Sequence, residues 1–355
     1  MSSRAGSSPL KVAFVYPNPR AELAAAVARG EAPDTGLLGQ NHLGAHGIET
    51  WIHTPRLRRR HRAGGAWHRL TWLAREITLP WELDGADAVC TPLGTLLPLA
   101  ARLRRRPRPV VFNISFCTAL GRSTGVKRRT LATSLRAAPA IVCFAEAQRR
   151  RLLEQTDADP ARVHVALLGV DPAFYTPSAG DRGYVLAVGR DLARDYETFA
   201  GAMRRLGRPG LIVASARNLA AVDVPDNVAV RLDVSATELR GLYAEAACVV
   251  VPTRSEEFRH GADCSGQTVL LDAMAMGRPV VATERSTLAE YVDEGRTAVT
   301  VPAGDAGALA DAVERVLDDP GLGAELGAAA RRRVEERHTT RHFAARLATI
   351  LEGLS

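Results

Sequence analysis

Short apolar runs alternate with amphipathic stretches through the first half of the chain. The runs that favour β-strands lie at residues 12–16, 49–53, 88–90, 109–114, 140–144 and 163–167. Stretches with a helical pattern separate them at residues 36–46, 93–105, 127–137 and 146–154. Strands that alternate with helices predict βαβ units and a parallel sheet. Because helices cover both faces of such a sheet, its strands are apolar without alternation.

The pattern begins again after residues 178–183, which have the composition of a linker. Strands are predicted at residues 184–188, 211–214, 248–252, 279–283 and 298–301. Helices are predicted at residues 195–206, 237–247, 269–276 and 305–317, and two more helical segments follow. We therefore predict an α/β fold with two doubly wound, Rossmann-like domains. Ligands of such sheets bind beyond the carboxyl ends of the strands, so we expect the site in a cleft between the two domains.

These patterns divide the 355 residues into five predicted parts. They are a disordered leader at 1–9, an N-terminal domain at 10–172, a linker at 173–182, a C-terminal domain at 183–336 and a terminal helix at 337–355.

Arginine dominates the charge of the chain. The formal net charge is +7, and all but two of the 46 basic residues are arginine, a bias that a GC-rich bacterial genome also produces. The arginines cluster at 56–62 (Arg56 to Arg62) and at 102–108. Such a run is typical of a surface that binds phosphates, an anionic membrane or nucleic acid, and equally of a solvated loop. We expect no nucleic-acid binding, because the basic residues form no recognition motif.

The five cysteines predict neither disulfides nor a metal site. No two of them have the CxxC spacing, and several lie in strand-like runs, so we expect reduced thiols and a cytoplasmic protein. The N-terminus has no apolar signal-peptide core, and no apolar stretch is long enough to span a membrane. Four tryptophans near the first arginine run leave two interpretations open, core packing or peripheral contact with the inner face of a membrane. They are Trp51, Trp67, Trp72 and Trp81.

Residues 264–279 carry the first candidate binding site. Gly266 and its polar neighbours stand at the start of an amphipathic helix that ends at Gly277. A helix N-terminus presents free N–H groups and the positive end of the helix dipole, which suits a diphosphate. Asp272 lies within reach of a ribose attached to that diphosphate. The alternative is a capped helix with no ligand.

Residues 188–196 carry the second candidate. Gly189 follows the first strand of the second domain, where the backbone must turn sharply. Arg190 and Arg194 project from the same loop, and two guanidinium groups can clamp the oxygens of a diphosphate and stabilise it as a leaving group. The two motifs together are more specific than either alone.

Together these segments resemble the retaining GT-B glycosyltransferases of family 4, which transfer a sugar from a nucleoside diphosphate. The matching segments are residues 169–171, 188–196, 235–243, 265–277, 287–292 and 301–305. The resemblance implies an acceptor-binding N-terminal domain, a nucleotide-sugar-binding C-terminal domain and a last helix that packs back on the first domain. It implies a UDP-, GDP- or TDP-sugar as co-substrate, with no metal and no other cofactor.

The resemblance also implies roles for matching residues. Arg190 and Arg194 would bind the donor diphosphate, and Asp272 would hold the ribose hydroxyls. The resemblance implies further donor-site residues, several of which would bind the phosphates through backbone N–H groups. They are Gly189, Ser265, Gly266, Gln267 and Thr268.

One position departs from the family. Where the family has a glutamate that contacts the donor sugar, this chain has Cys264. Asp263 or Ser265 could replace the glutamate, the donor could lack the hydroxyl that it binds, or activity could be lost. We predict that Asp263 takes over.

The N-terminal domain offers fewer candidates. Family members often carry a histidine after the fourth or fifth strand, and residues 112–117 contain none. Four side chains could contact an acceptor, and structural roles are the alternative. They are Asn41 and His42 on the predicted first helix, and Asn113 and Ser115.

We therefore expect retaining transfer of a hexose or deoxyhexose from a nucleoside diphosphate sugar to a hydroxyl of a small molecule, a natural product or a lipid. Two alternatives stay open. A related GT-B epimerase or hydrolase would need no acceptor, and a non-catalytic GT-B protein would bind nucleotide weakly. A dinucleotide-dependent oxidoreductase is disfavoured, because neither domain opens with GxGxxG.

Overall fold

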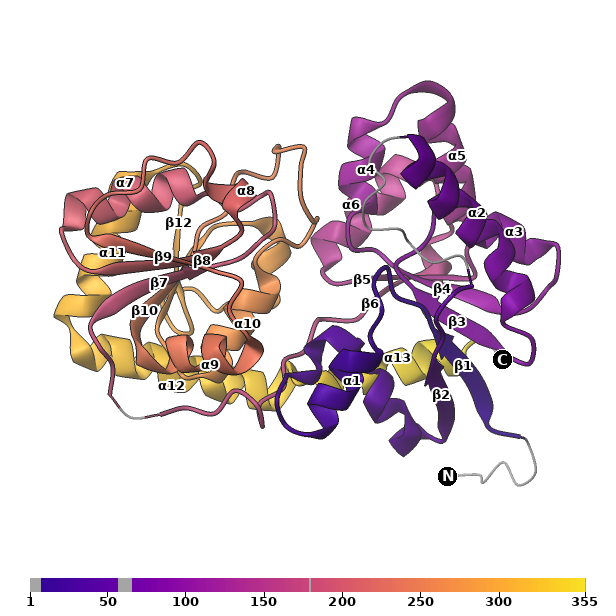
Figure 1. Cartoon of the computed structure of the whole chain (residues 1–355), viewed down its shortest axis with the longest axis horizontal. Helices are drawn as coiled ribbons and strands as arrows, with labels where there is room; N and C mark the ends of the chain where they lie inside the picture. Colours follow the sequence, from indigo (N-terminus) through magenta and orange to yellow (C-terminus); the bar gives the residue numbers. More distant parts are fainter. Residues whose placement is uncertain (1–7, 57–65, 179, 355) are drawn as a thin grey trace. The chain divides into compact units, whose positions relative to one another are not determined.

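The apolar runs of the first half form one parallel sheet in the computed structural model, which describes residues 8–56, 66–178 and 180–354 (Figure 1). Its strands are β1 (Leu10–Phe14), β2 (Ile48–Ile52), β3 (Ala88–Thr91), β4 (Arg108–Phe112), β5 (Ala140–Cys143) and β6 (Val163–Val165). They are ordered β2-β1-β3-β4-β5-β6. This sheet belongs to a compact unit made of Met1–Ala24, Leu37–Ala166 and Phe343–Ser355, called unit 1 below.

Helices cover the sheet of unit 1 and bury its strands. They are α2 (Ala66–Glu82), α3 (Leu97–Arg102), α4 (Phe116–Arg122), α5 (Gly125–Ala137), α6 (Glu146–Thr156) and α13 (Thr340–Glu352). Phe343 of α13 packs against Phe112 and Phe144 at the ends of two central strands, with ring centroids 6.2 Å apart in both pairs. Strands β3 and β5 are buried along their whole length, as expected for a sheet covered on both faces.

Unit 2 contains Ala25–Gly36 and Leu167–His342 and holds the second parallel sheet. Its strands are β7 (Tyr184–Val188), β8 (Gly210–Ala214), β9 (Val228–Leu232), β10 (Ala246–Val251), β11 (Val280–Thr283) and β12 (Val299–Val301). They are ordered β12-β11-β10-β7-β8-β9. The chain therefore builds the sheet outward from β7 in one direction and returns to extend it from β10 in the other. The boundary between β7 and β10 is a topological switch point, the place where such sheets bind ligands.

Amphipathic helices cover both faces of the second sheet. They are α7 (Tyr196–Leu206), α8 (Ala216–Leu219), α9 (Ala236–Glu245), α10 (Gln267–Ala275), α11 (Ala306–Asp318) and α12 (Pro320–Arg337). Helices α7 and α11 lie on one face, and α9, α10 and α12 on the other (Figure 1). Helix α7 shows how the sequence sets this arrangement. Asp195 caps its N-terminus by accepting a hydrogen bond from Thr198 N at 3.3 Å, and its buried side carries Phe199 and Met203.

The predicted fold class is confirmed, because both halves are doubly wound parallel sheets with helices on their faces. The helix predicted at 36–46 is wrong. Two short 3-10 helices, Asp34–Leu37 and Gln40–His46, occupy that stretch, and the first α-helix is α1 (Ala21–Ala28). Gly39 and Gly47 have φ of 75° and 72° and interrupt helical geometry there. Asn41 and His42 therefore lie on a 3-10 turn rather than on the first helix.

Among the described elements, helices α1, α2, α4 and α8 and strand β9 were not predicted. Strand β9 is an edge strand with four of its five positions exposed, so it lacks the apolar run that marks the buried strands.

Candidate functional site

Two loops meet at the switch point of unit 2. One follows β7 and runs from Gly189 to the start of α7, and the other follows β10 and runs to the start of α10. Their backbones pair between Arg194 and Thr253. The carboxylate of Asp191 joins them as well, because it accepts hydrogen bonds from Ala193 N and Ala262 N, each at 2.9 Å. The two motifs are distant in the sequence, but they form one site at the carboxyl ends of β7 and β10.

The guanidinium of Arg194 lies against both glycines of this place. A Cβ added to Gly189 would stand 2.2 Å from Arg194 Nε, and one added to Gly266 would stand 3.2 Å from Arg194 Nη1. These glycines have φ of 144° and 100°, which side chains rarely adopt. Glycine is therefore required at both positions for the close approach of arginine and backbone.

Several buried polar atoms around Gly266 have no hydrogen-bond partner within the described residues. They are Arg194 Nε and Nη1, Thr253 Oγ1, Ser265 Oγ and Thr287 Oγ1. Arg194 is only 5% exposed, and its burial lowers the pKa of its guanidinium. An unsatisfied buried polar group costs about 1–3 kcal/mol, and more when it is charged. Hydrogen-bond donors in this state are available to a ligand that supplies acceptor oxygens.

Helix α10 adds its N-terminus to the same place. Gly266 is the residue that precedes its first turn and has left-handed backbone geometry. The side chain of Gln267 is fully buried and donates to Thr287 O at 2.7 Å, whereas Thr268 is exposed. The Gln267 side chain thus fixes the start of the helix, while the helix dipole favours an anion in front of it.

Asp272 lies further along α10 in a buried cluster with two tyrosines. Burial raises the pKa of Asp272 to about 8, although a hydrogen bond with the Tyr175 side chain acts in the opposite direction. The rings of Tyr175 and Tyr243 meet edge to face at 6.0 Å, and the Tyr243 hydroxyl is buried without a partner in the described chain. Burial therefore favours the neutral form of Asp272.

The remaining predicted donor residues differ in exposure. Arg190 is exposed and pairs with Asp233 at 3.2 Å, so it is not packed into the place that holds Arg194. Asp263 is buried, and its backbone carbonyl accepts from Arg285 Nη2 at 3.3 Å. Cys264 between Asp263 and Ser265 is half-buried and forms no disulfide bond.

The predicted residues of unit 1 lie at separate positions. Asn113 is fully buried, accepts from Phe116 N at 2.9 Å and contacts Cys117 Sγ at 3.4 Å, so its amide supports the start of α4. Ser115 is exposed and directly precedes α4. Asn41 Nδ2 lies 3.3 Å from His42 Nε2 on the 3-10 turn before β2.

The arginine run at 57–62 lies outside the described residues, as does the side chain of Trp67. Trp51 and Trp72 pack against the core of unit 1, and Trp72 donates to Glu76 at 2.8 Å. Trp81 is 49% exposed. No helix in the described ranges combines the length and the apolar character needed to cross a membrane. In the same ranges, no cluster of three or more His, Cys, Asp or Glu side chains is arranged to hold a metal ion.

Sequence reasoning missed several residues of the site in unit 2. Thr253 and Tyr243 contribute buried hydroxyls that have no partner among the described residues, and Asp191 joins the two loops by hydrogen bonds. The usable signal was position, since Asp191 and Thr253 closely follow the two strands at the switch point. Tyr243 lies on α9 at the end of the matching segment 235–243, but the sequence assigned it no role.

Residues 184–319 match the model of the family described as Glycosyl transferases group 1. The D-inositol 3-phosphate glycosyltransferase of Salinispora arenicola is 30% identical over 220 residues, which are 51% of this chain and 47% of that protein. The chain thus spans about half the length of the curated relatives it matches.

The whole chain is similar in fold to solved glycosyltransferase structures. Sucrose-phosphate synthase from Thermosynechococcus elongatus superposes with a TM-score of 0.72 at 18% identity, covering 97% of this chain and 99% of that one. Anabaena HepE in complex with UDP-glucose gives a TM-score of 0.69 at 14% identity, covering 97% and 100%. At these identities the likeness shows the fold, which is the GT-B fold of two Rossmann-like units.

Proposed function

We propose that this chain is a glycosyltransferase that takes its sugar from a nucleoside diphosphate, and that the diphosphate binds between Gly189 and Gly266. The observation that carries the proposal is the set of buried, unpartnered hydrogen-bond donors around Gly266, with Arg194 at its centre. A diphosphate supplies the acceptor oxygens that these groups lack. The same groups lie inside the segment that matches the model of the group 1 glycosyl transferases.

The reaction follows from the charge that develops on the leaving group. The bond between the sugar C1 and the diphosphate oxygen breaks, the acceptor hydroxyl oxygen bonds to C1, and its proton passes to the departing phosphate. The buried Arg194 guanidinium and the N-terminus of α10 stabilise the negative charge on the diphosphate. Arg190 is exposed and paired with Asp233, and it reaches the diphosphate after that pair opens. Transfer on the same face of the sugar retains its anomeric configuration.

Donor selection rests on the segment that replaces the family glutamate. Asp263 is buried beside half-buried Cys264, and its carboxylate takes the place of the missing glutamate towards a sugar hydroxyl. Asp272 holds the ribose hydroxyls as a neutral carboxylic acid. The donor is a UDP-, GDP- or TDP-sugar, and the UDP-glucose complex of Anabaena HepE places UDP first in the panel to test. The transfer needs neither metal nor a further cofactor.

The acceptor is a hydroxyl of a small molecule, a natural product or a lipid, bound by unit 1. The name of the Salinispora relative places a phosphorylated polyol first among acceptors to test. Asn41, His42 and Ser115 are the side chains of unit 1 that remain accessible for it. An epimerase or hydrolase of the same fold is the second candidate, and a binding protein without activity is the third.

Mass spectrometry of products from a panel of nucleotide sugars, each with and without acceptors, tests the function. We expect that nucleoside diphosphate is released only when an acceptor is present, and that the glycosylated product has retained configuration. Release without acceptor would favour the hydrolase, and conversion to an isomer would favour the epimerase. No turnover with any donor, together with no nucleotide binding, would leave only the non-catalytic protein.

A further inference from the structure

A cavity of about 490 Å³ opens in unit 1 at the edge of the sheet where β4, β5 and β6 begin. The ends of α3 and α5 and the residues that follow α13 form its walls. All strands of a parallel sheet begin at one edge and end at the other, so this cavity is at the edge opposite to the one where such sheets bind their usual ligands. The proposed glycosyl transfer does not account for it.

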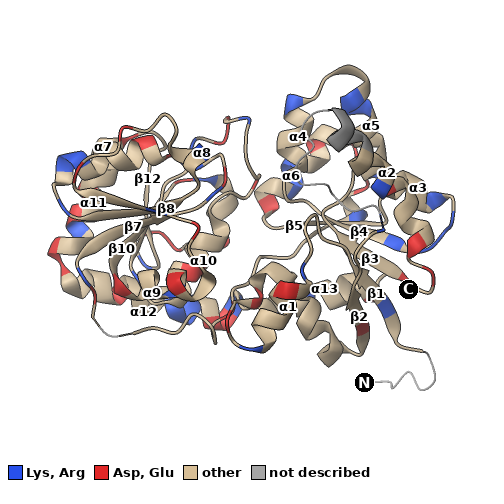
Figure 2. Ribbon diagram, viewed as in Figure 1, with Lys and Arg blue, Asp and Glu red and all other residues tan. Residues whose placement is uncertain are grey.

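Arginines provide the charge of this cavity, and no acidic side chain lines it. They are Arg102 at the end of α3, Arg105 in the loop that follows, Arg108 at the start of β4, and Arg162 directly before β6. Figure 2 shows in blue the basic residues of the chain around α3 and β4. Arg162 pairs loosely with Asp159, at 3.6 Å. The other three have no ion pair with any described residue. Guanidinium groups gathered without counter-charges favour an anion, and their forked geometry suits a phosphate.

The walls between the arginines are apolar and rigid. They are made of Pro98, Ala101, Pro107, Pro109, Ala137, Pro139 and Leu354. Proline has a fixed φ and no N–H group, so these walls offer a preformed apolar surface. The cavity therefore offers charge to a phosphate and apolar contacts to a group that the phosphate carries.

Arg105 has a backbone conformation that arginine rarely adopts. Its φ is 64°, in the left-handed region that favours glycine. An arginine in such a position persists at a cost in stability, and residues of this kind cluster at functional sites. The Arg105 N–H donates to Ala101 O at 3.0 Å, so this geometry ends helix α3 and holds Arg105 at the cavity.

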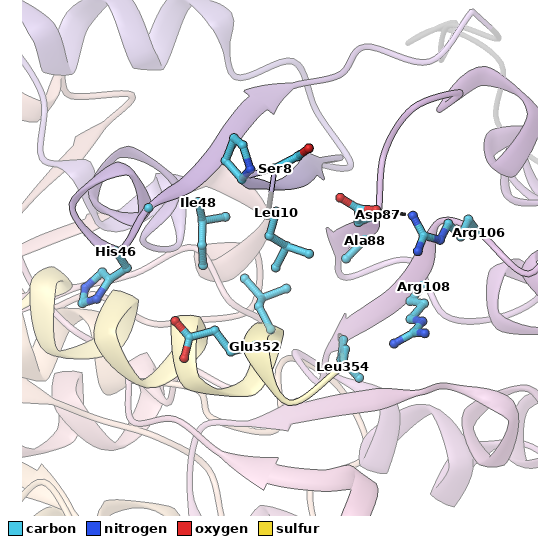
Figure 3. Close-up of a pocket in the computed structure, with 13 residues that line it drawn as sticks. Ser8, Leu10, His46, Ile48, Asp87, Ala88, Arg106, Arg108, Glu352 and Leu354 are labelled. Carbon is cyan, nitrogen blue, oxygen red and sulfur yellow. Dashed lines mark hydrogen bonds and ion pairs between the residues drawn. The ribbon is translucent and has the colours of Figure 1, made fainter. Parts of the chain in front are cut away.

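A neighbouring cavity of about 390 Å³ shows the contrast (Figure 3). It shares Arg108 and Leu354 with the first one, but Asp87 and Glu352 also line it. Arg106 turns towards Asp87 and forms an ion pair with it, whereas Arg108 extends separately near Leu354. In this smaller cavity, carboxylates balance the charge of the arginines. The unbalanced positive charge therefore lies in the larger cavity.

We propose that this larger cavity is a second anion site, which binds the phosphate of an organic phosphate ester or diphosphate. Two sources share this chemistry, a soluble phosphate and the headgroup of an anionic lipid. The guanidinium groups of Arg102, Arg105 and Arg108 bind the phosphate oxygens, and the proline walls contact the group attached to the phosphate.

The test compares two pairs of substitutions of equal charge in unit 1. Arg102→Gln/Arg105→Gln removes charge from the cavity, and Arg122→Gln/Arg129→Gln removes two exposed arginines that do not line it. Both are made in Arg194→Gln protein, so that the donor site contributes little. Inorganic pyrophosphate is titrated calorimetrically, and vesicles of phosphatidylglycerol or phosphatidylcholine are sedimented with each protein.

The cavity pair should weaken binding of the recognised probe at least about tenfold, the loss expected from charge-assisted hydrogen bonds, and the control pair should change it little. Loss confined to pyrophosphate identifies a soluble ligand, and loss confined to phosphatidylglycerol vesicles identifies a lipid headgroup. Failure of both probes to bind, or an equal loss in the two pairs, would overturn the proposal.

A single substitution gives an independent readout. Arg105→Gly relieves the backbone strain and removes one guanidinium. It should raise the melting temperature of the protein while it weakens binding of the same probe. A variant that is more stable and binds the probe as well as the parent protein would show that Arg105 has no part in the site.

Discussion

Asp272→Asn should make the protein more stable, and increasingly so as the pH rises. Burial raises the pKa of Asp272 from 3.8 to about 8 in the folded protein. Between these values the unfolded chain releases the proton while the folded protein keeps it. The contribution of Asp272 to the unfolding free energy therefore falls as pH rises, by about 1.4 kcal/mol per pH unit, and levels off above pH about 8.

Asparagine is neutral in both states and can still accept the hydrogen bond of the Tyr175 hydroxyl. The advantage of Asp272→Asn should be small near pH 4, grow across the window and reach the order of 5 kcal/mol above pH 8. Urea unfolding followed by circular dichroism at several pH values measures it. Fluorescence reports on unit 1 in the same samples, because all four tryptophans lie there.

Asp226→Asn is the matched control, since Asp226 is an exposed carboxylate of the same unit. It should leave the pH dependence of the wild type unchanged. A difference between Asp272→Asn and wild type that stays constant with pH, or that shrinks as pH rises, would refute the assignment of a protonated Asp272.

Three further predictions concern the donor site. Gly189→Ala places a methyl group 2.2 Å from Arg194 Nε. It should therefore lower the unfolding free energy by about 2 kcal/mol and abolish nucleotide binding. The control is Gly241→Ala on α9, where the added methyl group meets open space, and it should be neutral or stabilise the protein by up to about 1 kcal/mol. Asp263→Asn should remove donor turnover while nucleoside diphosphate still binds, and unchanged turnover would exclude a role for Asp263 in sugar recognition. Cys264→Ser should keep turnover near that of the wild type, and a large loss would assign the thiol a direct contact with the donor.

The fold could be predicted because its signal is local. Each buried strand of the two sheets is a short apolar run, and the periodicity between runs is helical, so the order of elements follows from the sequence alone. The α-helix predicted at 36–46 was wrong, because the apolar spacing there resembles that of a helix. Gly39 and Gly47 have left-handed backbone geometry, which interrupts an α-helix. Strand β9 lies at a sheet edge with four of its five positions exposed, so burial leaves no pattern in it.

The site could be predicted only in part, for a physical reason. Gly189, Arg194 and Gly266 follow strand ends or open a helix, and both features are visible in the sequence. The burial of Arg194, the exposure of Arg190 and the protonation of Asp272 depend on neighbours that come from distant segments. Thr253 and Tyr243 join the site only through packing.

Calorimetric titration of nucleoside diphosphates into wild type, Arg194→Gln and the surface control Arg332→Gln tests the central claim most directly. Wild type and Arg332→Gln should bind one nucleoside diphosphate with equal affinity. Loss of the Arg194 hydrogen bonds to a charged phosphate should cost about 2 kcal/mol, or roughly a 30-fold weaker Kd. Equal binding by all three proteins would contradict the placement of the diphosphate between Gly189 and Gly266.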